Sequence, residues 1–260
     1  MSGMCTAIVS IDPSSPCPVL LVGVRDEFAQ RPWLPPDRHW PDRPALIGGR
    51  DLQAGGTWLA VDPAVPRLSC VLNGHGPLAP GAVRLSRGEL PLLMADSGEL
   101  GDLDPVRYDP FHLLCAEPGA VRLWSWDGAD LTERSLGAGL HLVVNSGPEG
   151  ADLADGPGVA EMSARLDHFR PRLAAARRPL PAEGTTAQAW GEWLPLVDGD
   201  GLGLEDPRAL ILRRDFGDGR IWGTGSISLV ALRPGEVRYD FSGRPGDPSG
   251  WHRVPVQKIV

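Results

Sequence analysis

A cysteine stands almost at the start of this chain, in the segment MCTAIV (residues 4–9), and it opens a hydrophobic run with the character of a strand. If Cys5 is the first residue of the mature chain, it carries both a thiol and a free α-amino group. The ordinary pKa values are about 8.5 for a thiol and roughly 7.7–8.0 for an α-amine, so both groups titrate near physiological pH. The amine can then serve as general base for its own thiol. This chemistry requires removal of residues 1–4, which otherwise block the amine.

A charged cluster follows at residues 25–27, where Arg25 and Asp26 precede Glu27. An arginine beside the thiol lowers the thiol pKa, and a carboxylate can hold the ammonium group of the chain terminus. Successive side chains of a strand point to opposite faces, so only one of Arg25 and Asp26 can face the thiol. Two plainer interpretations stay open: an isolated cysteine commonly packs as a small hydrophobe, and the charges form a solvated cluster at a strand end.

Two asparagines lie at the ends of predicted strands, each before a turn that contains glycine. Asn73 precedes Gly74, and Asn145 precedes Ser146-Gly147. Asparagine in this place is typical of turns. An amide side chain, or a backbone N–H beside it, can also stabilise an oxyanion, and each such donor contributes about 2.7–4 kcal/mol in acyl transfer. Asn73 and Asn145 are therefore candidate oxyanion donors, with turn formation as the alternative.

Other reactive residue types lack a companion motif. His75, His112 and His252 stand alone, so we expect each to be a surface histidine or one whose hydrogen bonds are satisfied within the protein. None of the Cys and His spacings fits a zinc site, and we expect no metal. Cys17, which is followed by proline, has the form of a thiolate ligand for haem iron, which is a weak signal by itself. The glycine pair at 55–56 enters a strand and lacks the Lys-Ser/Thr of a phosphate loop.

The bulk composition excludes several classes of partner. The 260 residues carry a formal net charge of −8, which argues against nucleic acid or an anionic membrane as the main partner. No stretch approaches the roughly 20 apolar residues of a membrane span, so we expect no stable membrane insertion. No secretory signal is visible, and the four cysteines are widely spaced, which favours reduced thiols in a cytoplasmic protein. The excess of arginine over lysine, with abundant glycine and proline, indicates a GC-rich bacterial genome.

Short strands between turns rich in glycine and proline dominate the sequence. Residues 5–11 and 19–24 flank a turn-rich loop and are predicted to form an antiparallel hairpin. Prolines between residues 30 and 50 preclude regular structure there and predict a long loop that covers a site. Further strands are predicted at residues 57–61, 68–72, 111–116, 121–126, 140–144, 221–222, 226–232 and 237–241.

Helices are predicted in three places. Ser86 and Glu89 fit a capping box before an apolar run. Pro91 lies too far into that helix for its first position, so the sequence predicts the helix start only to within one turn. Apolar residues recur at three- and four-residue spacing over residues 159–173, and Pro171 is predicted to kink or end this helix.

A shorter apolar stripe lies within residues 186–196. Strands, then helices, then strands again indicate a single α+β domain over residues 1–260, with residues 1–4 as a start-site extension.

Several segments together resemble the NRDE family, also called the transport and Golgi organisation family. They are MCTA (4–7), VRDEF (24–28) with RP (31–32), GRDL (49–52) with GGTWL (55–59), and SRGEL (86–90). The strand that ends at Asn145 and the pair Gly223-Thr224 continue the match in order. The resemblance therefore spans nearly the whole chain, and the segment 49–59 is its most specific part.

The resemblance implies a four-layer αββα sandwich of the N-terminal nucleophile hydrolase type, similar to bile-salt and penicillin V acylases. In such a sandwich two antiparallel sheets pack face to face with helices outside. Carried over by motif, Cys5 is the nucleophile, Arg25 and Asp26 form the charged motif beside it, and Asn73 and Asn145 take the oxyanion positions. The family is linked to haem trafficking and to Golgi and lipid homeostasis, which implies haem as a ligand rather than a required cofactor.

Three departures from the family pattern bear on function. Val24 stands where the signature has asparagine, Gly225 stands where many members place arginine after Gly-Thr, and three residues precede Met4. A start at Met4 would let removal of that methionine expose Cys5.

Two functions therefore follow from the resemblance. The first is a binding or trafficking protein for haem or a lipid-like ligand, with limited or no catalytic activity. The alternative is hydrolysis of an amide or thioester through a Cys5 acyl intermediate. The expected partner in both cases is a small molecule: haem, an acyl compound or an amide compound.

Overall fold

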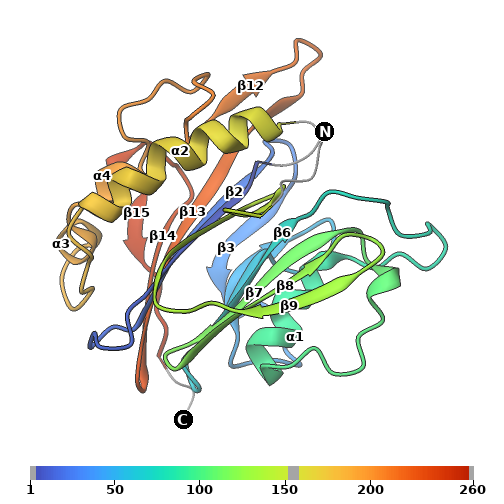
Figure 1. Ribbon diagram of the computed structural model, residues 1–260, viewed down its shortest axis with the longest axis horizontal. Coiled ribbons are helices and arrows are strands. Elements are labelled where there is room, and N and C mark those ends of the chain that lie inside the picture. Colours follow the sequence, from blue (N-terminus) through green and yellow to red (C-terminus); the bar gives the residue numbers. More distant parts are fainter. Residues whose placement is uncertain (1–3, 152–157, 258–260) are drawn as a thin grey trace.

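The computed structural model describes residues 4–151 and 158–257, so residues 1–3 of the expected start-site extension lie outside the described residues. Two antiparallel sheets make up most of this part of the chain (Figure 1). The first sheet contains β1 (Thr6–Ile11), β2 (Val19–Phe28), β10 (Gly139–Val144), β11 (Gly147–Pro148), β12 (Arg213–Asp215), β13 (Ile221–Arg233), β14 (Glu236–Ser242) and β15 (Trp251–Arg253). Its order is β11-β10-β1-β2-β13-β14-β15, with β12 paired to β13.

The second sheet is a meander in which the spatial order of the strands follows the sequence. It contains β3 (Trp33–Asp37), β4 (Ile47–Asp51), β5 (Leu59–Asp62), β6 (Arg67–Asn73), β7 (Phe111–Glu117), β8 (Ala120–Trp126) and β9 (Leu131–Ser135). The predicted hairpin of the first sheet is confirmed, because β1 pairs with β2 from Thr6 opposite Val24 to Ile11 opposite Val19.

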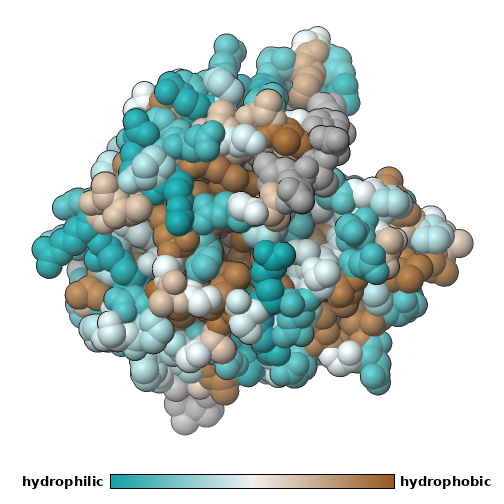
Figure 2. All heavy atoms as spheres, viewed as in Figure 1, coloured by the Kyte–Doolittle hydropathy of each residue, from teal (hydrophilic) through white to brown (hydrophobic). Residues whose placement is uncertain are grey.

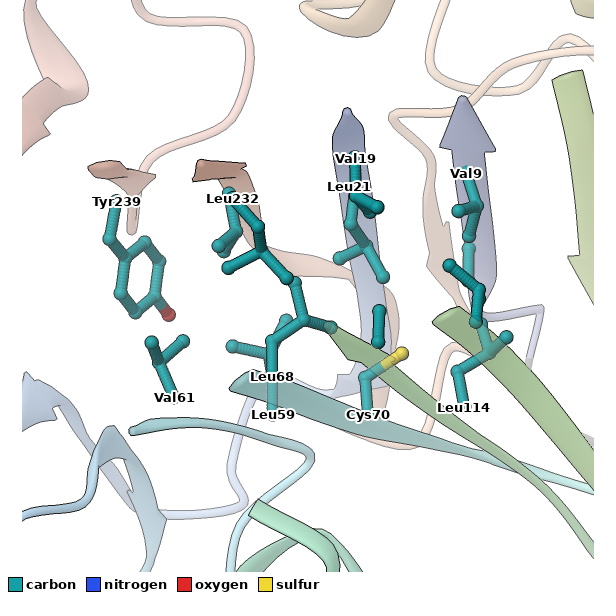
Figure 3. Close-up of a cluster of buried hydrophobic side chains, with 14 of the residues drawn as sticks. Val9, Val19, Leu21, Leu59, Val61, Leu68, Cys70, Leu114, Leu232 and Tyr239 are labelled. Carbon is teal, nitrogen blue, oxygen red and sulfur yellow. The ribbon is translucent and has the colours of Figure 1, made fainter. Parts of the chain in front are cut away.

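A large hydrophobic core separates the two sheets. Figure 3 shows Val9, Val19 and Leu21 of the first sheet facing side chains from the second sheet. The facing side chains include those of Leu59, Leu68, Cys70 and Leu114. Alternate residues along each strand point to this core, as the period of two in strand geometry requires. Apolar burial between the sheets is the main force that holds them face to face.

Helices cover the outer face of each sheet (Figure 1). The described helices are α1 (Leu90–Ser97), α2 (Val159–Ala175), α3 (Thr186–Trp190) and α4 (Trp193–Val197), with 3-10 turns at Arg87–Glu89, Pro105–Arg107 and Pro248–Gly250. The last three α-helices pack on the first sheet through a second apolar cluster, and α1 packs on β5, β6 and β7. The order helix, sheet, sheet, helix confirms the predicted αββα sandwich.

The segment between residues 30 and 50 differs from the prediction. It contains β3 and β4, so the expectation of a loop without regular structure is wrong. Two prolines are accommodated because β3 is the edge strand of its sheet, and its pairing with β4 shifts register between Leu34 and Asp37. An edge strand needs no N–H on its outer side, which is where proline is tolerated.

Two helix ends also differ from the prediction. Helix α2 continues past Pro171 to Ala175, because that proline lies in the exposed last turn while buried Leu173 anchors the turn to the first sheet layer. Before α1, the Ser86 hydroxyl accepts from the N–H of Gly88 at 3.1 Å and begins a 3-10 turn, rather than closing a capping box with Glu89.

Candidate functional site

A cavity of about 340 Å³ lies at one end of the sandwich and is lined from both sheets. Its volume falls in the range of small-molecule sites, roughly 300–1,000 Å³. Most of the lining is polar or charged. The lining residues are Cys5, Arg25, Asp26, Glu27, Arg31, Asp51, Ala54, Thr57, Trp58, Val71, Asn73, Arg84, Leu85, Ser86, Arg87, Gly88 and Asp109.

Cys5 lies directly before β1, half-buried, at the wall of this cavity. The backbone N–H of Asp26 donates to its Sγ at 3.4 Å, and the thiol lies 3.6 Å from the Asp26 carbonyl oxygen. Burial raises the pKa of the Cys5 thiol to about 12, and the Asp26 carboxylate adds to the rise, whereas the Asp26 N–H and Arg25 oppose it. With Met4 attached, the thiol is therefore protonated at neutral pH and is a weak nucleophile.

Arg25 and Asp26 are both buried, so the interpretation as a solvated charge cluster is wrong. They point to opposite faces of β2, as strand geometry predicts. The Arg25 guanidinium lies over the Trp58 ring, 4.5 Å from its centroid. It is also 3.6 Å from the Asp51 carboxylate and 3.8 Å from that of Glu27. Arg25 is thus the charged residue of the pair that faces the cavity and the second sheet.

The Asp26 carboxylate instead joins a buried network below α2. It accepts from the Thr224 hydroxyl at 2.6 Å and lies 3.5 Å from Nη1 of Arg165. The same Nη1 donates to the Thr6 hydroxyl at 2.8 Å and to the carbonyl oxygen of Met4. Burial raises the pKa of Asp26, and the Arg165 guanidinium opposes that rise. The network therefore reaches the peptide bond that precedes Cys5.

Arg165 is a site residue that the motif search missed. Its side chain is fully buried, and its Nε and Nη2 have no hydrogen-bond partner among the described residues. The sequence does carry a signal for it. Arg165 lies three residues after Met162 and four before Phe169, which places a charged residue inside the apolar stripe of α2. A buried arginine requires an acidic partner, and the stripe alone does not identify Asp26.

Met4 occupies an apolar niche beside this network and is itself buried. It packs against three other apolar side chains, those of Phe28, Leu212 and Trp222. Removal of residues 1–4 vacates this niche. The new α-amine of Cys5 would begin from the same backbone atom that now carries the Met4 peptide, close to Arg165.

The two candidate oxyanion residues meet at the same end of the sandwich. Asn73 ends β6 and lines the cavity. Asn145 follows β10, is fully buried, and donates from Nδ2 to the carbonyl oxygen of Asn73 at 2.8 Å. Its Oδ1 has no partner among the residues that the structure describes. Asn145 therefore ties the first sheet to the second, and Asn73 is the asparagine that faces the cavity.

Two close contacts made by the segment 49–59 leave room for glycine alone. A Cβ at Gly49 would lie 2.3 Å from the Trp58 ring, so only glycine leaves room for the tryptophan that stacks on Arg25. A Cβ at Gly56 would lie 2.4 Å from the backbone of Gly88. This contact brings the turns at 55–58 and 86–88 together at the cavity wall.

The departures from the family pattern have clear structural settings. Val24 is buried on the helix-facing side of β2 and adds to the apolar cluster there. Gly225 lies beside Arg25, and a Cβ built on it would be in ordinary van der Waals contact with that arginine, 3.5 Å from its Nη1. Thr224 is followed directly by Gly225 rather than by arginine, and in this structure it is Arg165 that supplies the cation beside Asp26.

His112 and His252 agree with the expectation of a hydrogen-bonded or a surface histidine, whereas His75 does not. His112 is buried, its Nδ1 lies 2.9 Å from the Ser125 hydroxyl, and burial lowers its pKa to about 4. His252 is exposed and packs edge-on against Phe241. His75 is half-buried, and neither of its ring nitrogens has a partner within the described ranges.

Cys17 lies away from the cavity. It is fully buried, with Sγ 3.6 Å from the Leu232 carbonyl oxygen and 3.9 Å from that of Val19. Haem iron ligated by this thiol would have to enter the core, so the geometry gives no support to that site. Within residues 4–151 and 158–257, no three His, Cys, Asp or Glu side chains cluster as metal ligands would. None of the described helices is long and apolar enough to cross a bilayer.

An apolar surface borders the cavity. Figure 2 shows hydrophobic atoms gathered at the right edge of the molecule, over the long connection between β6 and β7. The exposed apolar residues of this connection are Leu78, Val83, Leu85 and Val106. Leu85 also lines the cavity, so the apolar surface reaches its mouth.

Comparison with known proteins identifies the family. A family model described as Transport and Golgi organisation 2 matches residues 4–152, which is more than half of the chain. The chain belongs to this family. No curated protein matches the sequence significantly. Among solved structures, a Caenorhabditis elegans orthologue of N-acylethanolamine-hydrolyzing acid amidase is similar with a TM-score of 0.48 and 10% sequence identity, over 96% of this chain and 100% of its own.

Proposed function

We propose that this member of the transport and Golgi organisation 2 family binds a small acyl compound in the cavity at Cys5. When Cys5 is the first residue, the thiol cleaves the amide or thioester bond of that compound. The observation that carries this proposal is the position of Cys5. Its thiol lies at the wall of a cavity lined from both sheets, and the peptide bond before it is held by a buried arginine.

The chemistry proceeds through an acyl intermediate. Sγ of Cys5 attacks the carbonyl carbon, the S–C bond forms, and the thiol proton passes to the α-amine. The carbonyl oxygen becomes an oxyanion, for which Asn73 is the candidate donor. The C–N or C–S bond then breaks as the amine returns the proton to the leaving group. Water hydrolyses the acyl-enzyme and regenerates the thiol.

Arg165 acts on the amine rather than on the substrate. The amine must be unprotonated to accept the thiol proton, and a neighbouring cation lowers the pKa of an amine. Arg165 supplies that cation, and its contact with the Met4 carbonyl marks it as a neighbour of the new chain terminus. The Asp26 backbone N–H, which donates to Sγ, favours the thiolate.

Binding without cleavage is the second candidate function, and the raised thiol pKa favours it for the unprocessed chain. A lipid-like ligand would place its polar end in the charged cavity and its apolar part over Leu85 and Val83. Haem is less well matched, since none of the described residues that line the cavity is a histidine. Titration with hemin tests this ligand, because a carrier of haem gives a saturable Soret shift at micromolar concentration.

Acyl trapping tests the hydrolase. Two forms are prepared, one starting at Met4 so that methionine removal exposes Cys5 and one retaining residues 1–4, and intact mass verifies each terminus. Both are incubated with p-nitrophenyl acetate, and the acetylated residue is located by peptide mapping. We expect an acetyl group on Cys5 in the processed form alone. Cys5→Ala abolishes it, and Cys17→Ala, which removes a buried thiol away from the cavity, retains it. Equal acetylation of Cys5 in both forms, or none in either, contradicts the proposal.

A further inference from the structure

We propose that the cavity contains a subsite for one anionic group, a carboxylate or a phosphate, built on Arg87. This inference rests on the proposed function and narrows its ligand class: the bound acyl compound carries a negative charge. Four arginines line the cavity among the described residues: Arg25, Arg31, Arg84 and Arg87.

Three of these arginines are already paired with carboxylates. Arg25 has Asp51 at 3.6 Å and Arg31 has the same carboxylate at 2.5 Å. Arg84 has Asp109 at 3.1 Å. Arg87 has no carboxylate within 4 Å in the described part of the chain.

The Arg87 guanidinium is held in place but keeps donors free. Its Nη1 donates to the Pro110 carbonyl oxygen at 2.8 Å, and Nε and Nη2 have no partner among the described residues. The residue is half-buried, so its charge is partly removed from water, and this burial lowers the pKa of Arg87. A partly desolvated cation without a counter-ion is unfavourable, so an anion bound here gains more than it would at the surface. The planar guanidinium can present two parallel N–H groups to a carboxylate or phosphate.

The backbone under Arg87 is fixed before any ligand arrives. The N–H of Gly88 donates to the Ser86 hydroxyl at 3.1 Å, and the Gly88 carbonyl oxygen accepts from the N–H of Thr57 at 2.9 Å. Gly56 packs against the backbone of Gly88 so closely that a Cβ there would have no space, and this contact holds the turn from its other side. A guanidinium on such a turn loses little freedom when it binds, which favours a site over a mobile surface charge.

The subsite and the thiol share one electrostatic environment. Asp109 raises the pKa of Arg87, and so would the thiolate form of Cys5, whereas Arg84 and Arg31 lower it. Since Asp109 lies beyond 4 Å of Arg87 and is paired with Arg84, the charge of Arg87 remains available to a ligand. An anion on Arg87 would therefore sit in the same cavity as the reacting sulfur.

Two alkylating reagents of equal size test this arrangement. Iodoacetate carries a carboxylate and iodoacetamide does not, and the ratio of their rates at Cys5 cancels the thiolate fraction at a given pH. We expect Arg87→Gln to lower the iodoacetate-to-iodoacetamide ratio about tenfold at low salt, because one nearby charge is lost. High salt should reduce the ratio of the unaltered protein in the same direction. Arg208→Gln is the matched control, since it removes an exposed arginine that pairs with Asp206 outside the cavity.

A second measurement does not depend on thiol reactivity. Sodium acetate and inorganic phosphate are compared with chloride at constant ionic strength, and the thermal midpoint is followed. We expect the preferred anion to raise the midpoint of the unaltered protein and of Arg208→Gln, and to leave Arg87→Gln unchanged. The comparison of acetate with phosphate identifies the group. Equal midpoint shifts in all three proteins, or an unchanged alkylation ratio in Arg87→Gln, overturn the subsite but not the hydrolase, whereas loss of Cys5 acylation overturns the hydrolase alone.

Discussion

The two ends of the sandwich use the same strands for opposite purposes. At one end, Val19 and Leu21 of β2 face the second sheet within the hydrocarbon core of Figure 3. At the other end the same face of β2 presents Arg25 to the cavity, and the opposite face changes from Leu20 to Asp26. Within a few residues, a single strand therefore passes from the apolar core to the charged cavity.

Partners from distant elements make the charged end possible. Arg25 is covered by Trp58, and Asp26 is held by Thr224 and Arg165. The apolar end needs no such specific pairing, because any side chains of suitable size can exclude water from each other. The apolar end should therefore tolerate replacement of one apolar side chain by another of similar size. The charged end should not, because each buried charge depends on one particular partner.

Among substitutions that test the difference between the two ends, we expect the largest loss of stability at Arg165. Arg165→Met leaves the fully buried Asp26 carboxylate without its cation, and we expect a loss of about 3–5 kcal/mol in the free energy of unfolding. Urea denaturation measures it. The double variant Arg165→Met/Asp26→Leu is the control, because removing both charges should recover much of the loss. A double variant as unstable as the sum of the two single variants would show that the pair is not coupled.

Most strands were predictable from sequence, whereas β3, β4, β9, β11, β12 and β15 and the partners of the buried charges were not. The apolar residues at 19–24 predict the start of β2 correctly, but β2 continues to Phe28 because Arg25 and Asp26 are buried rather than solvated. Nothing local to β2 indicates that coverage, since Arg165 and Thr224 lie far along the chain. The capacity of β3 to hold prolines likewise depends on its place at a sheet edge, which is a property of the assembled sheet.

The candidate site was predictable where a motif names the residue. Cys5, Arg25 and Asn73 line the cavity together. Asn145 does not line it and instead donates a hydrogen bond to the carbonyl oxygen of Asn73. Arg165 was missed because a motif search looks for clusters in sequence, and its partners are on β2 and before β1.

A substitution at the apolar end should separate stability from chemistry. Leu114 is fully buried in the core between the sheets, so Leu114→Ala should lower the free energy of unfolding by about 2–5 kcal/mol. Because Leu114 is not among the cavity residues, the rate of Cys5 alkylation below the unfolding transition should stay within about twofold of the unaltered protein. A much larger change in rate would mean that the two ends do not act independently.

The pH dependence of stability tests a buried polar residue on the same strand, since His112 lies on the same face of β7 as Leu114. The pKa of His112 is lowered from 6.5 to about 4 by burial, so the unfolded state binds the proton more tightly. The contribution of His112 to stability is thus complete above about pH 6.5 and is lost as the pH falls towards 4, by up to about 3 kcal/mol. Urea denaturation of His112→Gln should show a shallower loss over this interval. Parallel curves for the two proteins would contradict the assignment.

Alkylation of Cys5 by iodoacetamide as a function of pH tests the central claim, that an exposed α-amine turns a dormant thiol into a nucleophile. With Met4 attached, the thiol pKa of about 12 predicts a rate that rises about tenfold per pH unit, with no plateau up to roughly pH 10. With Cys5 as the first residue, the rate should be higher at neutral pH and should level off within the accessible range. Superimposable profiles for the two forms would contradict the account.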